Sequence, residues 1–428
     1  MTRATINAAL NGSPIASERR NSGETTFVTD LKASSFPPQF WLLFSGMLIS
    51  AIGASMIWPF LMIYISERLA SPLTVNAGLI TLNSIAGLLS SLIAGPIIDR
   101  LGRKRVMVIS LTTNALGFVL LSRAASLAAF ASLMVLQGAS NPLYRVGADA
   151  MIADLIPEGK RIDAYSRMRL SNNLGVAIGP AIGGFLASVS YTIAFYCAAG
   201  GLFLYGLFVA LGAKETLPTL TQAAGQAQPA LDKGLGGYKA VFEDRRFIRF
   251  ALTLVLPQVS AAILWVLLGV YTKTHFGISE KLYGWIPVTN ASMVVLFQLA
   301  VTAVSRRYPP LLALSIGSLL YGFGVGSVAV GQGFWWFWLS MVIVTLGEMV
   351  LVPTSSTYVA NLAPPDMRGR YMSLYSLTWI VAAGIGPLMG GFLNDNLGPL
   401  AIWVGGGAAG VLAAVLFLWE WRQSFAGA

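Results

Sequence analysis

The chain carries an internal repeat, with one copy of the repeated segment in each half. Residues 152–186, IADLIPEGKRIDAYSRMRLSNNLGVAIGPAIGGFL, align without a gap with residues 359–393, VANLAPPDMRGRYMSLYSLTWIVAAGIGPLMGGFL, at an offset of 207. The two copies share a GPxxGGFL block that begins at Gly179 and at Gly386. The chain is therefore a duplication, and we expect two similar halves whose interface is the place to look for a site.

The composition places this duplicated chain in a lipid bilayer. It is 55% hydrophobic and only 11% charged, with a mean hydropathy of +0.69. Soluble domains have about 25% charged residues. Apolar runs recur that are long enough to cross about 30 Å of hydrocarbon as helices. The single cysteine, Cys197, excludes an intramolecular disulfide and a cysteine metal cluster, and we expect it to be a small buried hydrophobe.

Apolar runs bounded by turn residues predict an all-α integral membrane protein with twelve transmembrane helices in two pseudo-symmetric six-helix bundles. We expect a cytoplasmic N-terminal segment at 1–38, bundles at 39–213 and 247–421, a cytoplasmic linker at 214–246, and a cytoplasmic tail at 422–428. The linker is hydrophilic and ends in a short amphipathic piece, GYKAVFEDRRF. The predicted helices are 39–65, 73–98, 104–122, 126–155, 163–188, 191–212, 247–273, 282–304, 311–330, 334–362, 370–394 and 399–420.

The positions of the basic residues predict the orientation. With twelve crossings from a cytoplasmic start, all but five of the 28 Lys and Arg residues fall on cytoplasmic segments. Arg68, Arg123, Lys273 and Lys281 fall outside, and Arg145 falls within the membrane. This is the positive-inside pattern. We expect a multi-pass protein of the bacterial inner membrane with both termini in the cytoplasm.

A basic loop between the second and third predicted helices carries the most specific motif. It runs Gly95-Pro96-Ile97-Ile98-Asp99-Arg100-Leu101-Gly102-Arg103-Lys104 and matches G-x-x-x-D-R-x-G-R-[RK] in full. Here the chain resembles the major facilitator superfamily, from the first helix to the last. The resemblance implies that Asp99 helps to hold the two halves together on the cytoplasmic side. The alternative is that the loop only fixes topology. The equivalent place in the second half, Thr302 to Pro309, has neither the aspartate nor the second glycine.

A glycine-rich motif in the fifth helix is similar to the antiporter signature of that superfamily. It comprises Gly175, Gly179, Pro180, Gly183 and Gly184, and its spacing lets helix backbones approach closely. The resemblance implies export, and the drug:proton antiporter group is the closest in character. The eleventh helix repeats the Gly-Pro-x-x-Gly-Gly part, so ordinary helix packing stays open as the alternative.

Ionisable residues inside the hydrocarbon are candidate functional groups because burying a charge there is costly. Glu348, near the middle of the tenth helix, is the strongest candidate for proton coupling, with Asp149 as a second. Arg145 lies one turn before Asp149, and we expect the two to pair. The alternatives are a purely structural pair and a Glu348 carboxyl that neighbouring hydroxyls merely hold.

Polar and aromatic residues in the predicted helices could line the pathway or join helices. The candidates are Trp58, Asn141, Tyr144, Asn172, Asn173, Gln258, Trp265, Asn290, Tyr358 and Trp379. No nucleophile, metal or cofactor constellation is recognisable, so we expect a transporter rather than an enzyme.

Taken together, the sequence predicts proton-driven export of apolar or amphiphilic, cationic compounds by alternating access. The energy source is the proton gradient, without a cofactor or metal. The expected partners are a small-molecule substrate, protons and the bilayer, not nucleic acid, and the protein is expected to be monomeric. The alternatives are a proton-coupled symporter of a polar nutrient and a lipid or lysolipid transporter.

Overall fold

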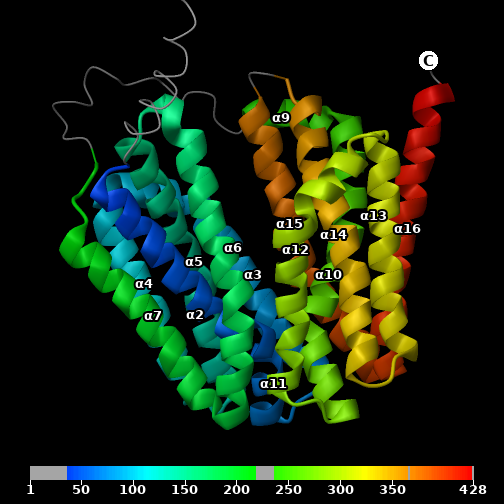
Figure 1. Cartoon of the computed structure of the whole chain (residues 1–428), viewed down its shortest axis with the longest axis horizontal. Helices are drawn as coiled ribbons and strands as arrows, with labels where there is room; N and C mark the ends of the chain where they lie inside the picture. Colours follow the sequence, from blue (N-terminus) through cyan, green and yellow to red (C-terminus); the bar gives the residue numbers. More distant parts are fainter. Residues whose placement is uncertain (1–35, 218–235, 365–366, 427–428) are drawn as a thin grey trace, which may run out of the picture.

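The first half of the computed structural model is a bundle of long helices. The structure describes residues 36–217, 236–364 and 367–426, and in these ranges the regular structure is helical. The helices of the first half are α2 (Pro38–Leu69), α3 (Leu73–Leu101), α4 (Arg103–Leu121), α5 (Leu127–Leu155), α6 (Glu158–Val189) and α7 (Tyr191–Gly212) (Figure 1).

The second half opens with a short helix, α9 (Gly236–Glu243), which is the amphipathic piece that ends the linker. The helices that follow are α10 (Arg245–Phe276), the one-turn α11 (Glu280–Tyr283), α12 (Trp285–Ser305), α13 (Pro310–Ser327), the 3-10 turn η1 (Val328–Val330), α14 (Phe334–Leu362), α15 (Arg368–Leu397) and α16 (Pro399–Ala426). The long helices begin and end within a few residues of the expected positions.

Eleven of the described helices are long and apolar enough to cross a membrane. The remaining long helix, α5, has 29 residues but carries Gln137, Asn141, Arg145 and Asp149, which lower its hydropathy. It packs against α3 and α4. At a rise of roughly 1.5 Å per residue, its 29 residues are long enough to cross the hydrocarbon core of a bilayer. The expected all-α membrane fold is confirmed.

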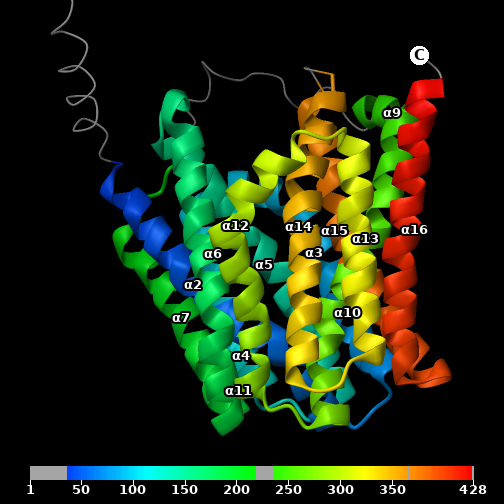
Figure 2. The same cartoon turned by 45° about the vertical axis from the view of Figure 1, so that its right-hand side comes forward.

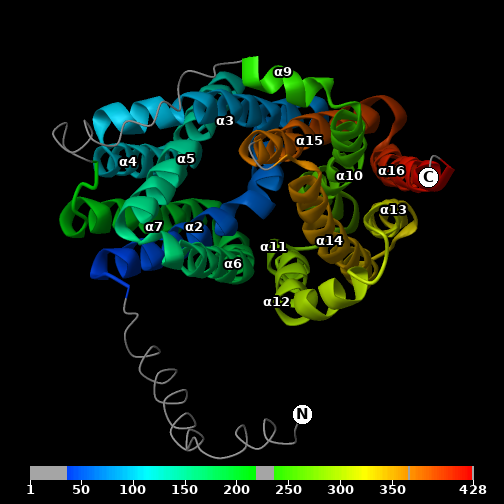
Figure 3. The same ribbon diagram turned by 90° about the horizontal axis from the view of Figure 1, so that it is seen from above.

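The two halves repeat the same packing scheme. In the first half α2 packs on α6 and α7, α3 on α5, and α4 on α5 and α7. In the second half the corresponding pairs are α10 on α15 and α16, α12 on α14, and α13 on α14 and α16. Figure 3 shows the two groups of helices side by side. The duplication seen in the sequence therefore appears as a repeated helix arrangement.

The glycines of the α6 motif create a close helix contact in the first half. A Cβ on Gly175 would lie 2.4 Å from the Ala51 side chain, and one on Gly183 would lie 2.2 Å from the Met56 carbonyl oxygen. A Cβ on Gly179 would also clash with α2. These three residues recur every fourth position, so they form one strip along α6 that lets the backbone of α2 approach.

The bundles meet on the side away from the linker. The helix pairs that join them are α3 with α15, α2 with α10, and α6 with α11 and α12. Figure 2 shows α6 beside α11 and α12. Towards the linker and the C-terminus the two groups of ribbons diverge (Figure 1). We call these two ends of the molecule the far side and the linker side.

Cys197 of α7 corrects one expectation. Its side chain is exposed on the bundle surface rather than buried. An apolar thiol in a lipid-facing position is compatible with the bilayer, where exposure does not mean contact with water.

Candidate functional site

Glu348 lies at the middle of the 29-residue helix α14 and has one strong hydrogen bond. Its Oε2 accepts a bond of 2.7 Å from Nδ2 of Asn290 on α12. The same amide nitrogen donates to Oγ1 of Thr345 at 3.0 Å, and Thr345 donates to the Met341 carbonyl oxygen. Both amide hydrogens of Asn290 are therefore used, which fixes the orientation of its side chain.

This arrangement suits a carboxyl that changes protonation state. Asn290 is buried, whereas Glu348 is partly exposed. A carboxylate accepts hydrogen bonds on both oxygens, and a protonated carboxyl still accepts on its carbonyl oxygen. Glu348 can therefore gain or lose a proton without losing the bond from Asn290. Hydroxyl neighbours alone do not account for its position, because its hydrogen-bond donor is an amide.

Arg145 and Asp149 of α5 lie one turn apart, as expected, but no ion pair within 4.0 Å joins them in the described chain. Both side chains are exposed. The Tyr165 hydroxyl donates to the backbone oxygen of Asp149 at 3.0 Å and leaves the carboxylate free. The spacing places both residues on one helix face, but the expected ion pair within 4.0 Å does not form there.

Three of the candidate lining residues meet at one small cavity inside the first bundle. Trp58, Asn141 and Tyr144 line it, together with Asn83 and Gln137. Its volume is about 20 Å³, which is room for about one water molecule. Asn83 and Gln137 donate to backbone oxygens of neighbouring helices. This cluster joins helices and is too small for a drug-sized compound.

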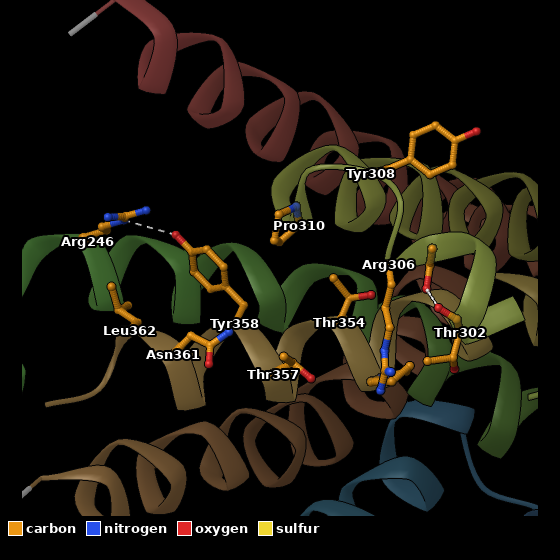
Figure 4. Close-up of a pocket in the computed structure, with 12 residues that line it drawn as sticks. Arg246, Thr302, Arg306, Tyr308, Pro310, Thr354, Thr357, Tyr358, Asn361 and Leu362 are labelled. Atoms are coloured by element: carbon orange, nitrogen blue, oxygen red, sulfur yellow. Dashed lines mark hydrogen bonds between the residues drawn. The ribbon is translucent and has the colours of Figure 1, made fainter. Parts of the chain in front are cut away.

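The other lining candidates lie apart from this cavity. Tyr358 lines a larger cavity of about 390 Å³ at the linker end of the second half (Figure 4). Asn290 holds Glu348. The remaining residues differ in exposure: Asn172, Gln258 and Trp265 are partly exposed, and Asn173 and Trp379 are exposed.

The basic loop motif is held within its own half. Arg103 forms ion pairs of 3.7 Å with Asp99 and 3.0 Å with Asp154 of α5. The backbone N–H groups of Arg103 and Lys104, at the start of α4, donate to the two carboxylate oxygens of Glu215 at 3.0 and 3.1 Å. Glu215 therefore caps the start of α4 with its carboxylate.

The glycines of this motif have different roles. Gly102 has φ +94°, and a Cβ there would lie 2.5 Å from Glu215, so this position requires glycine. A Cβ on Gly95 would meet nothing within 4 Å, so no neighbouring helix requires glycine there. Asp99 and Arg100 are exposed, and the ion pair of Asp99 with Arg103 lies within the first half.

On the far side, charged residues join the halves. Nζ of Lys273 on α10 lies 2.6 Å from Oε1 of Glu67 on α2 and also pairs with Glu280 at the start of α11. The Tyr191 hydroxyl at the start of α7 donates to the same Glu280 oxygen at 2.7 Å. We call Glu67, Lys273, Glu280 and Tyr191 the far-side charge cluster. Sequence reasoning placed Lys273 outside the membrane but gave no sign of its partners.

A second link uses a carboxylate of one half to cap a helix of the other. Asp395 of α15 accepts from the backbone N–H of Leu73 at 3.1 Å and of Thr74 at 2.8 Å, both in the first turn of α3. The Thr74 hydroxyl donates to the same carboxylate at 2.6 Å. A negative charge at a helix N-terminus is stabilising. The cap therefore ties the two halves together on the far side.

Two glycines at equivalent repeat positions complete this contact. A Cβ on Gly184 of α6 would lie 2.6 Å from the backbone oxygen of Glu280, and one on Gly391 of α15 would lie 2.8 Å from the Thr74 backbone. Their numbers differ by the repeat offset. The last glycine of each GPxxGGFL block therefore faces the opposite half, whereas the earlier α6 glycines face their own.

Comparison with known proteins identifies the family. A sequence profile of the Major Facilitator Superfamily matches residues 43–260 and 250–425, which together cover most of the chain. The chain belongs to the major facilitator superfamily. It is thus a multi-pass membrane transporter of a family in which proton coupling and alternating access are typical, and not an enzyme.

Individual relatives of this superfamily member are distant. It is 26% identical over 361 residues to the MFS-type transporter YhjO of Bacillus subtilis (strain 168), covering 83% of this chain and 86% of the relative. It is 26% identical over 403 residues to a Na(+), Li(+), K(+)/H(+) antiporter of Planococcus maritimus, covering 85% and 91%. It is 24% identical over 383 residues to the quinolone resistance protein NorA of Staphylococcus aureus (strain MSSA476), covering 88% and 96%.

The same fold occurs in solved superfamily structures. The nucleoside transporter NupG superimposes with a TM-score of 0.76 over 90% of this chain and 100% of that chain, at 15% identity. At this identity the likeness concerns the fold alone.

Proposed function

We propose that this protein exports apolar or amphiphilic, cationic compounds in exchange for protons, with Glu348 as the coupling group. The observation that carries the proposal is the position of Glu348, a partly exposed carboxyl at the middle of α14 that Asn290 holds from α12. The other described acids of the second half lie near helix ends, namely Glu243, Asp244, Glu280, Asp395 and Glu420. The resistance and antiporter functions named for two relatives support the same reading.

In the proposed cycle, Glu348 receives a proton while the transporter is open to the outside. Neutralising the carboxyl favours the form that is open on the linker side, which the charge distribution makes the cytoplasmic side. Arrival of the substrate promotes proton release. A proton can shift such a two-state equilibrium only if the two states bind it with different affinity, so Glu348 must have different surroundings in each. Asp149, exposed on α5, is proposed as a second protonatable group.

The test is a susceptibility panel in cells that overproduce the protein. We expect the wild type to raise the inhibitory concentration of several cationic amphiphilic drugs, and Glu348→Gln to abolish that gain. Glu243→Gln is the matched control, because the Glu243 side chain is 65% exposed on α9, where Lys239 is its ion-pair partner. Equal resistance with wild type and Glu348→Gln contradicts the coupling role, and no resistance with either contradicts drug export.

Exchange of monovalent cations for protons is a second candidate. The observation that favours it is the alignment with the Planococcus maritimus antiporter over 85% of this chain. Growth of overproducing cells in high NaCl or LiCl distinguishes it from drug export, because salt tolerance without drug resistance is expected for cation exchange only.

A further inference from the structure

The cavity at the linker end of the second half carries positive charge and polar groups. Its volume is about 390 Å³, and it lies among α10, α12, α13 and α14. Two of its lining residues are arginines, Arg246 and Arg306, and none is an acid. Nε of Arg246 donates to the Tyr358 hydroxyl at 3.2 Å, as Figure 4 shows. The Glu420 carboxylate of α16 interacts electrostatically with Arg246, but the two groups lie more than 4.0 Å apart and do not form an ion pair. The cavity therefore favours an anion.

One face of α14 supplies hydrogen-bonding groups to this cavity. Thr354, Thr357, Tyr358 and Asn361 all line it, and their spacing places them on a single helix face. Thr302 and Ser305 of α12 line it as well. Figure 4 shows Arg306 beside Thr354 and Thr302, and Arg246 beside Tyr358. Each guanidinium group therefore has hydroxyl groups beside it, and such a set of donors matches the oxygens of a phosphate or of a polar head group, which accept charge-assisted hydrogen bonds.

An apolar groove adjoins the polar cavity. Its volume is about 330 Å³, and it shares Ser305 and Tyr308 with the cavity. Its other lining residues are apolar: Ala300, Val301, Val304, Ala313, Ile316 and Val350. Val304 is 53% exposed and Ile316 is 44% exposed, so the groove lies on the outer surface of the bundle, where lipid chains lie. A charged cavity and an apolar groove thus meet at the linker-side edge of the membrane.

In the first half, the basic loop already has a carboxylate from the same chain beside it. This loop lies beside a cavity lined by Arg100, Lys104 and Arg105, and that cavity contains the carboxylate of Glu215. Arg306 stands at the repeat position of Asp99, and α13 begins at Pro310, which stands at the repeat position of Arg103 and has no N–H to donate. The first half supplies an anion to its basic loop, whereas Arg306 forms no ion pair within 4.0 Å among the described residues.

We propose that this cavity and groove form a binding site for one anionic phospholipid. Arg306, at the end of the cavity that adjoins the groove, holds the phosphate. Arg246 and the polar face of α14 donate to the rest of the head group, and an acyl chain occupies the groove between α12 and α13. Basic pockets between helices on the cytoplasmic side are suited to such head groups. The site is separate from Glu348 and does not depend on the transported substrate.

The test measures lipid retention by the purified, delipidated protein. Dioleoylphosphatidylglycerol is titrated, bound lipid is counted by native mass spectrometry, and the unfolding temperature is followed in parallel. We expect one tightly held lipid and a raised unfolding temperature. The double variant Arg246→Gln/Arg306→Gln should weaken that binding by about 30-fold, or about fivefold for each arginine at the membrane surface. Arg307→Gln is the matched control, because Arg307 neighbours Arg306 in the sequence but does not line the cavity.

A second variant separates the lipid from a soluble anion. Val304→Trp fills the exposed groove, so it should weaken lipid binding and leave the binding of inorganic phosphate unchanged. Equal retention by wild type and the double variant overturns the proposal. It is also overturned if inorganic phosphate at matched concentration raises the unfolding temperature as much as the lipid does, or if dioleoylphosphatidylcholine binds as tightly.

Discussion

Lys273 of α10 and Glu67 of α2 form an ion pair of 2.6 Å that joins the two halves on the far side. The same ammonium pairs with Glu280, whose carboxylate also accepts from Tyr191. One lysine thus neutralises an acid from each half. Because the two groups of helices diverge towards the linker side, this pair stabilises the arrangement in which the halves meet on the far side.

Replacing Lys273 by Met leaves Glu67 and Glu280 without their cation and should shift the protein towards a form in which the halves separate on the far side and approach each other on the linker side. An ion pair of this kind is worth about 1 kcal/mol, so the shift in population is about fivefold. Spin labels at positions 158 and 369, in a Cys197→Ser background, report the distance between the halves by double electron–electron resonance. We expect a larger population of short distances. Lys239→Met, which removes an ion pair within α9 alone, should leave the distances as in the wild type.

Gly391→Ala should also disfavour the contact on the far side. The new Cβ would lie 2.8 Å from the Thr74 backbone of the other half, and neither backbone can move without separating α3 from α15. We expect the short-distance population to rise and the unfolding temperature to fall. Gly200→Ala on α7 is the control, because its Cβ meets nothing within 4 Å and alanine favours a helix by roughly 0.5–1 kcal/mol. Identical behaviour of the two variants would contradict this account.

Asp395→Ala removes a helix cap that comes from the other half. Loss of a capping side chain costs about 1 kcal/mol, and here the cost falls on the contact between the halves. A cysteine at Ser84, which faces Gly384 of α15, reports opening when an impermeant maleimide is added from the outside. We expect labelling about fivefold faster in Asp395→Ala. An unchanged rate, with Glu158→Ala as the reference for a merely exposed acid, would argue against the cap.

Glu215→Ala should destabilise the first half near the basic loop. It leaves the backbone N–H groups of Arg103 and Lys104 without their acceptor and should cost about 0.5–2 kcal/mol. Thermal unfolding of the purified protein measures this loss. Glu243→Ala should have little effect on stability. If Glu243→Ala destabilised the protein as much as Glu215→Ala, the loss in Glu215→Ala could not be ascribed to the cap.

The repeat and the helix positions could be predicted because they follow from local patterns. Apolar runs of about 20 residues define the spans, and the gap-free offset identified the second half from the first. The packing role of Gly175, Gly179 and Gly183 followed from their spacing, since every fourth residue lies on one helix face. Gly95 of the basic loop motif meets no neighbour, because membership of a motif does not say which helix lies opposite.

The contacts between the halves could not be predicted. Asp395 and Thr74 are 321 residues apart, and no spacing rule connects an acid at the end of α15 with the start of α3. For Arg145 and Asp149 a spacing rule predicted an ion pair that does not form, because a one-turn spacing allows an ion pair without requiring it. The role of Glu215 was missed since it lies at the edge of a linker, where a carboxylate usually has a solvated position.

The most direct test of the account is proton movement driven by substrate in proteoliposomes. With an internal pH-sensitive dye and an imposed pH gradient, addition of a drug identified in the susceptibility panel should accelerate proton flux in the wild type and in Glu243→Gln. The account predicts no acceleration in Glu348→Gln at the same protein content and with retained drug binding. Substrate-driven proton flux in Glu348→Gln equal to that of the wild type would contradict it.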